Sequence, residues 1–317
     1  MTSHEELIPA DPQFVAEAAA ILRAGKVCAF ATETVYGLGA DATNSDAVLA
    51  IYETKGRPRF NPLIVHCSDL AMAERIAVFS PLAWRLARFW PGPLTLVLPI
   101  KADAGLSDIV TAGLETIGIR IPDHPLALEL LAEVGRPLAA PSANPSGRLS
   151  PTTAEQVRKG FAGRVPVLDG GPCRAGVEST ILAIAGERVV QLRAGALARE
   201  TIMEMLDEPV EVAAEGTDIA APGMLTSHYA PQAQLRLNAE APQSGEIYLA
   251  FGPSAHIRAF ANLSPSGDLH EAARNLFSML HALDATGADR IAVAPIPQTG
   301  LGEAINDRLK RAAAPRG

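Results

Sequence analysis

The chain has 317 residues, a formal net charge of −8 at pH 7, and 48% hydrophobic but only 5% aromatic residues. This length allows two domains whose cores need no disulfide bonds, and the composition is typical of a globular protein rich in small side chains. Because proteins that bind duplex nucleic acid usually present a basic face, the acidic balance argues against nucleic acid as the main ligand.

The cysteine, N-terminal and hydropathy patterns are those of a cytoplasmic protein. Cys28, Cys67 and Cys173 are widely spaced and form no C-x-x-C pair, which favours reduced, buried thiols over a disulfide framework or a zinc site. The N-terminus is acidic and lacks the basic and apolar regions of a signal peptide. No apolar run approaches the roughly 18 residues that span a bilayer. We therefore expect a cytoplasmic protein without membrane contacts.

Helical and strand-like patterns alternate through the first two thirds of the chain. A helix is expected to begin at Pro12 and end before Gly25, and another to begin after an N-cap at Asn44 or Ser45. Further helices are expected over 68–77, 81–89, 125–134, 154–161 and 198–206, and strands over 27–31, 62–66, 94–100, 116–121, 137–140, 165–168, 180–184 and 189–192. This alternation predicts an α/β sheet with helices on its faces.

A change in composition marks the end of this region. Residues 200–235 contain no Lys or Arg and are rich in Ala, Glu and Pro, which is typical of a domain boundary. We therefore predict a first domain over 1–208, a linker over 209–234, and a smaller α/β domain over 235–317. The last domain is expected to contain strands over 235–237, 246–251 and 291–294 and helices over 267–283 and 301–311.

A basic loop precedes the strand over 62–66. Lys55, Arg57 and Arg59 lie within five residues, and Gly56 and Pro58 stiffen the segment between them. A rigid loop with ammonium and guanidinium groups can neutralise a polyphosphate, since Arg gives forked contacts and Lys a point charge. An exposed, solvated basic loop is the alternative interpretation. The pattern favours an anion site.

Three other features bear on the ligand. Arg120 lies inside an apolar strand, where a lone charge is costly, so it needs an anionic partner that a substrate carboxylate could provide. The glycines at 171 and 176 have the spacing of a P-loop, but the required Lys is missing, which excludes that motif. Ser142 lacks a G-x-S-x-G context and is interpreted as a binding hydroxyl rather than a nucleophile.

Five ordered motifs make the pattern specific. They are Thr32-Glu33-Thr34-Val35-Tyr36-Gly37-Leu38, Lys55-x-Arg57-x3-Asn61-Pro62-Leu63-Ile64-Val65-His66, Trp90-Pro91-Gly92-Pro93-Leu94-Thr95, Pro141-Ser142-Ala143-Asn144 and Gly176-Val177-Glu178-Ser179-Thr180. Together they closely resemble the YrdC/Sua5 family of threonylcarbamoyl-AMP synthases over residues 12–206. Residues 221–224 and 228–231, with the C-terminal unit, resemble the longer, two-domain Sua5 type.

The resemblance implies a fold and a reaction. The fold would be a twisted, mostly parallel open sheet around a concave groove, followed by a smaller Rossmann-like α/β domain. The reaction would join L-threonine, bicarbonate or CO2, and ATP into L-threonylcarbamoyladenylate with release of pyrophosphate, for tRNA modification at t6A37. Such a nucleotidyltransferase would act by positioning and charge neutralisation. The linker with its His228-Tyr229-Ala230-Pro231 segment would be a lid that excludes water from the product.

The resemblance also implies site residues and partners. Lys55 and Arg57 would act on the phosphates. L-threonine would contact Thr34, His66, Arg120, Ala140 and Ser179. ATP would contact Arg57, Asn61, Thr116, Ser142, Ser150, Arg193 and Tyr229. Mg2+ would accompany the triphosphate, with no dedicated metal site, and the product would go to a tRNA threonylcarbamoyl-transferase complex without stable nucleic-acid binding by this chain.

Two alternatives belong to other classes. An RNA-binding module could use the basic loop, although the net charge of −8 opposes it. A carbamoyl-adenylate enzyme like the related domain of hydrogenase maturation proteins would need acylphosphatase and zinc-finger segments, which this sequence lacks.

Overall fold

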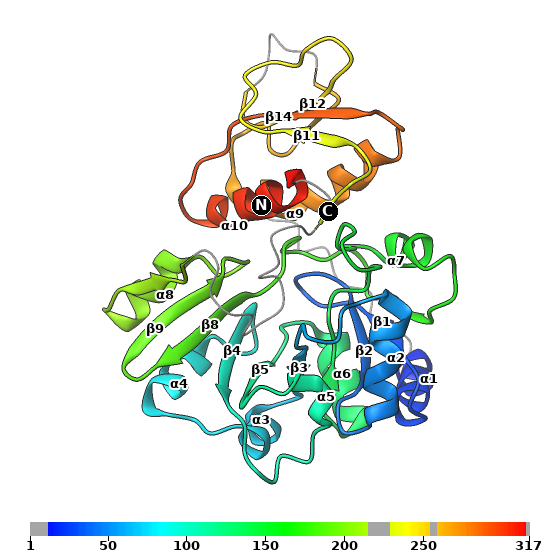
Figure 1. Ribbon diagram of the computed structural model, residues 1–317, viewed down its shortest axis with the longest axis vertical. Coiled ribbons are helices and arrows are strands. Elements are labelled where there is room, and N and C mark those ends of the chain that lie inside the picture. The colour runs from blue at the N-terminus through cyan, green and yellow to red at the C-terminus, as the bar shows by residue number, and fades with distance from the viewer. Residues whose placement is uncertain (1–11, 215–228, 254–258, 315–317) are drawn as a thin grey trace.

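A computed structural model of the chain describes residues 12–214, 229–253 and 259–314, which form two α/β units (Figure 1). In the first unit the helices are α1 Pro12–Arg23, α2 Ser45–Lys55, α3 Leu70–Ile76, α4 Pro81–Leu86, α5 Asp108–Thr111, α6 Pro125–Val134, α7 Ala154–Gly160 and α8 Arg199–Leu206, with a 3-10 turn at Ala87–Phe89. Its strands are β1 Cys28–Phe30, β2 Gly37–Asp41, β3 Ile64–His66, β4 Leu94–Pro99, β5 Thr116–Arg120, β6 Leu138–Ala139, β7 Val167–Leu168, β8 Thr180–Ala185, β9 Arg188–Arg193 and β10 Val210–Val212.

The first unit contains one ten-stranded sheet in the order β10-β9-β8-β4-β5-β3-β6-β2-β1-β7. Four of its neighbouring pairs are parallel, namely β10/β9, β8/β4, β5/β3 and β1/β7. The other five pairs are antiparallel. The α/β class is confirmed, and the large sheet is mixed; two of its antiparallel pairs, β1/β2 and β8/β9, are joined by short connections without a helix.

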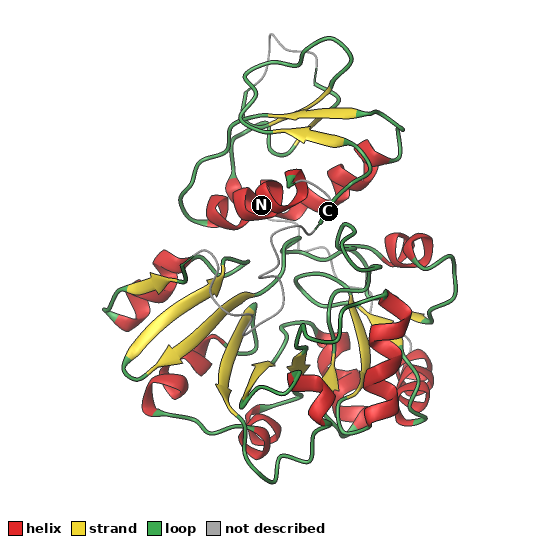
Figure 2. Ribbon diagram, in the orientation of Figure 1, coloured by secondary structure: helices red, strands yellow, loops and turns green. Residues whose placement is uncertain are grey.

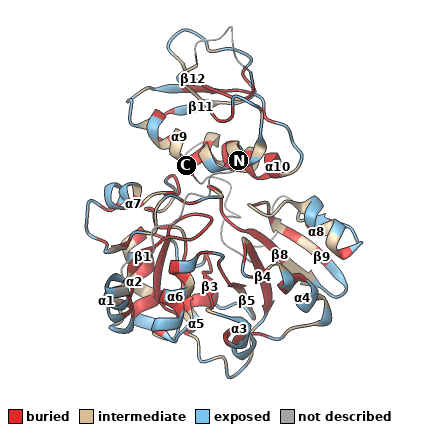
Figure 3. Ribbon diagram, turned by 180° about the vertical axis from the view of Figure 1, so that it is seen from behind, coloured by how far each residue is buried: buried red, intermediate tan, exposed pale blue. Residues whose placement is uncertain are grey.

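Different elements pack against the two faces of the large sheet. Leu94, Leu96 and Leu98 of β4 point to one face, where they share a core with the apolar sides of α2, α3, α4 and α8. Side chains alternate along a strand, so Thr95 and Val97 point to the opposite face. There Val97 packs with Ile64 and Ile181 in a small cluster. Helices α1 and α6 cover the end of this face formed by β1, β6 and β7, and the rest is the open face of the sheet. Figure 3 shows central strands such as β3 and β4 largely buried, strand β9 partly exposed, and helices such as α1 and α3 with many exposed residues.

Local sequence signals explain where the helices begin and end. The Asn44 side chain accepts hydrogen bonds from two backbone N–H groups of α2, which confirms the predicted cap. Gly56 ends that helix with a φ of +62°, a left-handed conformation that favours glycine. At α7, Thr153 and Gln156 form a reciprocal capping box. These caps fix the residues that follow α2 and precede α7, and both loops lie near the site.

The second unit contains α9 Leu269–Asp284, α10 Leu301–Ala313, and the strands β11 Gln234–Arg236, β12 Ile247–Ala250, β13 Ala261–Asn262 and β14 Arg290–Val293. Its sheet has the order β11-β14-β12-β13, and all three pairs are parallel. Figures 1 and 2 show α9 and α10 on the side that faces the first unit, with the small sheet behind them.

Close contacts join the two units. Thr152 Oγ1 lies 2.8 Å from Ser278 Oγ on α9, and Gln191 Nε2 donates to Glu303 Oε1 on α10 at 2.8 Å. A Cβ on Gly176 would lie 2.4 Å from the Cα of Arg274, so only glycine permits this approach of the 170–180 loop to α9. The second unit therefore packs directly against loops of the first.

Four short elements were not expected from the sequence: β2, α5, β10 and β13. Strand β2 contains two glycines and no β-branched residue, so its sequence does not resemble a strand. It pairs with β1, where a Cβ on Gly39 would lie 2.8 Å from the ring of Phe30, so glycine serves packing there rather than turning. Strand β10 lies inside the predicted 209–234 linker and extends the large sheet to Val212.

Part of the predicted linker lies outside the described residues, including 221–224 and His228. None of the helices in the described ranges combines the length and apolar character that a membrane span needs.

Candidate active site

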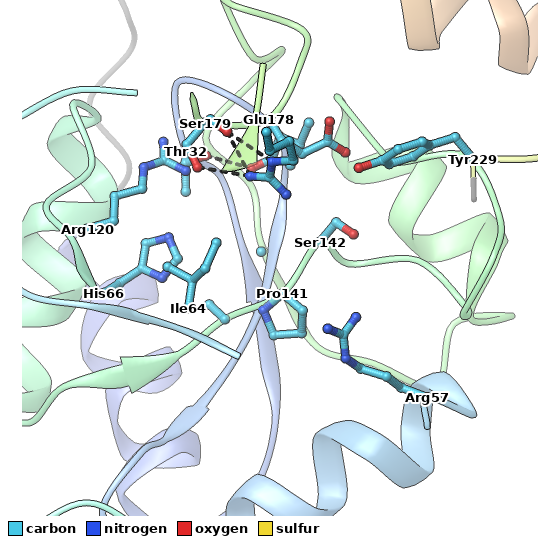
Figure 4. A pocket seen from close by; sticks show the side chains of 14 residues that line it. Thr32, Arg57, Ile64, His66, Arg120, Pro141, Ser142, Glu178, Ser179 and Tyr229 are labelled. Atoms are coloured by element: carbon cyan, nitrogen blue, oxygen red, sulfur yellow. Dashed lines mark hydrogen bonds between the residues drawn. The ribbon is translucent and has the colours of Figure 1, made fainter. Parts of the chain in front are cut away.

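A cavity of about 50 Å3 lies between the open face of the large sheet and the second unit. It is lined by Thr32, Val35, Gly37, Arg57, Ile64, His66, Arg120, Ala140, Pro141, Ser142, Glu178, Ser179, Arg193 and Tyr229. Figure 4 shows Arg120 and His66 on one side and Arg57 and Tyr229 on the other. Three arginines and one carboxylate among these residues make the cavity electropositive.

Arg120 and His66 lie next to each other because β5 and β3 are paired in parallel with these two residues in register. Arg120 Nη2 lies 2.7 Å from Glu33 Oε1, and both side chains are buried. The buried Arg120 charge therefore already has a protein carboxylate as its partner, and a substrate carboxylate would approach as a second anion. Burial and the nearby Arg120 charge lower the pKa of His66 to about 3, so His66 is neutral at physiological pH.

Arg57 follows the end of α2 and lies at the other side of the cavity. Its Nε and Nη2 donate to the backbone carbonyls of Asn61 and Pro62 at 3.3 and 3.0 Å, which fixes the guanidinium. Burial is the largest cause that lowers the pKa of Arg57 to about 10, so Arg57 remains charged at neutral pH. Tyr229 lies within the predicted 209–234 linker and is buried, with a φ of +62°.

Ser179 and Arg193 connect the two sides of the cavity. Arg193 Nη2 donates to the carbonyl oxygen and to Oγ of Ser179 at 2.8 and 3.1 Å. Ser179 Oγ also lies 2.8 Å from Thr95 Oγ1. Burial lowers the pKa of Arg193. These contacts hold a hydroxyl and a cation together on the open face of the sheet.

Glu178 contributes the only carboxylate among the described lining residues. Its Oε1 accepts a hydrogen bond from Ser150 Oγ at 2.5 Å, and its Oε2 accepts one from Arg308 Nε at 2.8 Å. Burial raises the pKa of Glu178, but the charges of Arg308 and Arg193 outweigh it and lower the pKa to about 2. Glu178 is therefore ionised, and each of its two carboxylate oxygens accepts a hydrogen bond.

Eight of the predicted residues line the cavity: Arg57, His66, Arg120, Ala140, Ser142, Ser179, Arg193 and Tyr229. Their assignment to threonine or to ATP stays a prediction. The other five predicted residues, Lys55, Thr34, Asn61, Thr116 and Ser150, are not among its lining residues.

Lys55 does not face the cavity. Its Nζ donates to the carbonyls of Ser142, at 2.6 Å, and of Asn144. The left-handed cap at Gly56 turns the chain between Lys55 and Arg57, so the two side chains separate. Lys55 thereby ties α2 to the 141–144 loop, and its predicted action on the phosphates stays a prediction. Burial, and then Arg57, lower the pKa of Lys55 well below its usual value.

The remaining four residues lie around the cavity. Thr34 Oγ1 lies 2.8 Å from Oγ1 of Thr32, which does line it. Asn61 is buried behind Arg57, and Ser150 behind Glu178. Thr116 lies at the start of β5, on the same face as Arg120 but about 13 Å away at the usual rise of a strand.

Sequence reasoning did not assign Thr32, Glu33, Glu178 or Arg308 to the site. Glu33 and Glu178 belong to motifs that had been recognised, and an ionisable residue inside such a motif was a usable signal. Arg308 had no local signal, because it contacts Glu178 across a separation of 130 residues.

Across residues 12–214, 229–253 and 259–314 no group of three or more His, Cys, Asp or Glu side chains could hold a metal ion. Glu178, the one carboxylate among the described lining residues, is paired with Arg308, so these residues provide no carboxylate cage for a resident divalent cation.

Two family models match the chain in succession. The first, for Sua5, YciO and YrdC sequences and described as Telomere recombination, matches residues 20–195. The second, described as the C-terminal domain of threonylcarbamoyl-AMP synthase, matches residues 197–314. The chain belongs to the Sua5/YciO/YrdC family. Because both models match, it is of the two-domain Sua5 type.

Similar proteins span both units. The threonylcarbamoyl-AMP synthase of Bacillus subtilis is 44% identical over 98% of this chain and 96% of its own length. The corresponding protein of Pyrococcus abyssi is 40% identical over 94% of each chain. A crystal structure of P. abyssi Sua5 complexed with L-threonine superposes with a TM-score of 0.87 and 38% identity, covering 96% of this chain and 95% of that chain.

Proposed function

We propose that this family member is an L-threonylcarbamoyladenylate synthase. It condenses L-threonine, bicarbonate or CO2, and ATP to threonylcarbamoyl-AMP and releases pyrophosphate, as a nucleotidyltransferase that serves t6A37 modification of tRNA. The observation that carries this proposal is a single cavity with Arg120 on one side and Arg57 on the other, in a chain similar over its length to named synthases. One side suits an amino-acid carboxylate and the other a triphosphate.

At the threonine side, Arg120 contacts the substrate carboxylate while Glu33 holds the guanidinium from behind. Because the ion pair is already formed, Arg120 is oriented before the substrate arrives, and less entropy is lost on binding. His66 is neutral and can accept or donate a hydrogen bond without adding charge. Ser179 and Ala140 complete this side, with Thr34 acting through Thr32.

At the nucleotide side, Arg57 and Arg193 neutralise the phosphates, and Ser142 and Tyr229 contact the remainder of ATP. Asn61 and Ser150 act through the residues that they support. Thr116 lies on the same open face of the sheet, where a nucleotide longer than the present cavity could reach it. Lys55 positions the loop that carries Ser142.

The substrates themselves supply the groups that react. The threonine amine adds to CO2 and loses a proton to give a carbamate, whose oxygen attacks the α-phosphorus of ATP in line while the pyrophosphate oxygen leaves. Developing negative charge on the phosphates is stabilised by the fixed guanidinium groups. Mg2+ enters with the triphosphate as part of the substrate, and it supplies charge neutralisation there.

We further propose that the product is passed to a tRNA threonylcarbamoyl-transferase complex. The acyl phosphate mixed anhydride is hydrolysable, so a buried site and a prompt acceptor preserve it. An RNA-binding role alone is less well supported, because the arginines that line the cavity are buried rather than spread over an exposed surface.

The test is pyrophosphate release from ATP and bicarbonate, with and without L-threonine. We expect release to depend on threonine, and Arg120→Gln to raise the KM for threonine by about tenfold or more. Arg174→Gln is the matched control, because Arg174 is an exposed arginine paired with Asp123 outside the cavity lining. Pyrophosphate release that is indifferent to threonine would overturn the proposed substrate and revive the carbamoyl-adenylate alternative.

A further inference from the structure

The most deeply buried cation of the described chain belongs to the second unit but touches the first. Arg308, on α10, has 0% relative exposure. Its Nε donates to Glu178 Oε2 at 2.8 Å, and its Nη1 donates to Asp307 Oδ2 at 2.6 Å. A buried guanidinium is tolerated only when it is paired and hydrogen-bonded, so these two carboxylates hold it in place.

Arg308 also contacts a second residue that lines the cavity. Its guanidinium carbon lies 5.3 Å from the centre of the Tyr229 ring, within the range of a cation–π interaction. The Tyr229 ring packs against Phe277 of α9, with 5.5 Å between ring centres. Tyr229 is thereby held by both helices of the second unit. Because its φ is positive, this backbone conformation needs such support.

Glu178 connects Arg308 with other residues of the nucleotide side. Its other oxygen accepts from Ser150 Oγ, so one carboxylate connects Arg308 with a residue of the 145–152 loop. Arg193, which lines the cavity and holds Ser179, is the next cation near Glu178. The hydrogen bond from Arg308 sets the direction of the Glu178 carboxylate, which also lies within the influence of the Arg193 charge.

We propose that Arg308 is a positioning residue of the nucleotide side, through which the C-terminal domain completes the ATP site by holding Glu178, Ser150 and Tyr229. This inference rests on the proposed function, because it assigns ATP to that side of the cavity. It gives the second domain a defined task in the reaction, through the contacts of Arg308 with Glu178 and Tyr229, of Phe277 with Tyr229, and of His281 with the Ser150 carbonyl.

The experiment compares Arg308→Met with Glu303→Gln in the full chain. Glu303 makes other contacts between the units, to Gln191 and Arg199, so its variant reports loosening of the interface alone. Calorimetric titrations with ATP and, separately, with L-threonine give two affinities that do not require turnover. Pyrophosphate release then gives the KM for each substrate.

We expect Arg308→Met to weaken ATP binding about tenfold, the size of a typical coupling within one hydrogen-bond network, and to change threonine affinity less than about twofold. Glu303→Gln should leave both affinities near the wild-type values. ATP affinity unchanged in Arg308→Met, or weakened equally by Glu303→Gln, would overturn the inference. Threonine-independent pyrophosphate release by the wild type would instead overturn the proposed function, whatever the variants show.

Arg308→Lys decides the question if Arg308→Met does not fold. The ammonium keeps the buried charge but cannot contact Glu178 and lie over the Tyr229 ring as a planar group does. We expect ATP affinity to fall about threefold or more with threonine affinity retained. Wild-type ATP affinity in this variant would contradict the positioning role.

Discussion

Acidification should destabilise the first domain through His66. The side chain is buried, and burial followed by the Arg120 charge lowers its pKa to about 3, against 6.5 for an exposed histidine. Since the folded-state pKa is depressed, the unfolded chain binds the proton first. The contribution of neutral His66 to the free energy of unfolding is therefore complete above pH 6.5. It is lost progressively as the pH falls from 6.5 toward 3.

The size of the effect follows from the two pKa values. Each pKa unit between the folded and the unfolded state corresponds to about 1.4 kcal/mol. The free energy of unfolding therefore falls through His66 by about 2 kcal/mol at pH 5 and about 3 kcal/mol at pH 4. Such a loss is a large fraction of the net stability of an ordinary domain, which is about 5–15 kcal/mol. The effect should therefore be measurable above the contributions of other groups.

The assay is urea unfolding at pH 7, 5 and 4, followed by tryptophan fluorescence. The two tryptophans of the chain, Trp84 and Trp90, both belong to the first domain, so the signal reports the unit that contains His66. The variant His66→Gln cannot titrate and should lose about 3 kcal/mol less than the wild type between pH 7 and pH 4. His270→Gln, at an exposed position of α9, is the control and should follow the wild type. A His66→Gln variant with the wild-type pH dependence would refute the reasoning.

Three further predictions concern contacts around the cavity. Lys55→Met should cost about 2 kcal/mol in thermal unfolding and weaken ATP binding, because two loop carbonyls lose a buried donor; unchanged ATP affinity would contradict the positioning role. Gly176→Ala should be about 1–3 kcal/mol more destabilising than Gly171→Ala, since both have positive φ but only Gly176 would clash with α9; equal denaturation midpoints would exclude the close approach as the cause. Glu33→Gln should cost about 3–5 kcal/mol by leaving Arg120 buried without its counter-charge, and should raise the threonine dissociation constant; wild-type stability in urea would show that the ion pair contributes little.

Much of the fold follows from local signals in the sequence. Asn44 and Thr153 are caps whose chemistry acts within three residues, so both helix starts could be predicted without tertiary information. The strand β2 could not be predicted, because its glycines report contact with Phe30 across a neighbouring strand. Strand β10 could not be predicted either, since its three residues become a strand only by pairing with β9.

Some residues of the site could likewise be predicted from local sequence, and others could not. Arg57 could be predicted to belong to the site because a stiff loop carries it to a strand end, and it lines the cavity. The neighbouring Lys55 resembles it in sequence, yet the turn at Gly56 sends its ammonium to loop carbonyls. Arg308 lies near Lys310 and Arg311 in the last turns of α10, so its sequence context resembles that of the exposed Lys310. Only the packing of α10 against Glu178 distinguishes the two.

The distribution of charge supports the proposed placement of the two substrates. Arg120 is paired with Glu33, so the charges on that side of the cavity are balanced, which suits a zwitterionic amino acid. Both hydrogen bonds of Arg57 go to neutral carbonyls within the described residues, and Glu178 is neutralised by Arg308. The excess of positive charge therefore lies at the nucleotide side, where a triphosphate needs it. The net charge of −8 conceals this arrangement because it sums over the whole chain, whereas the buried cavity is sensitive to its own few charges at low dielectric.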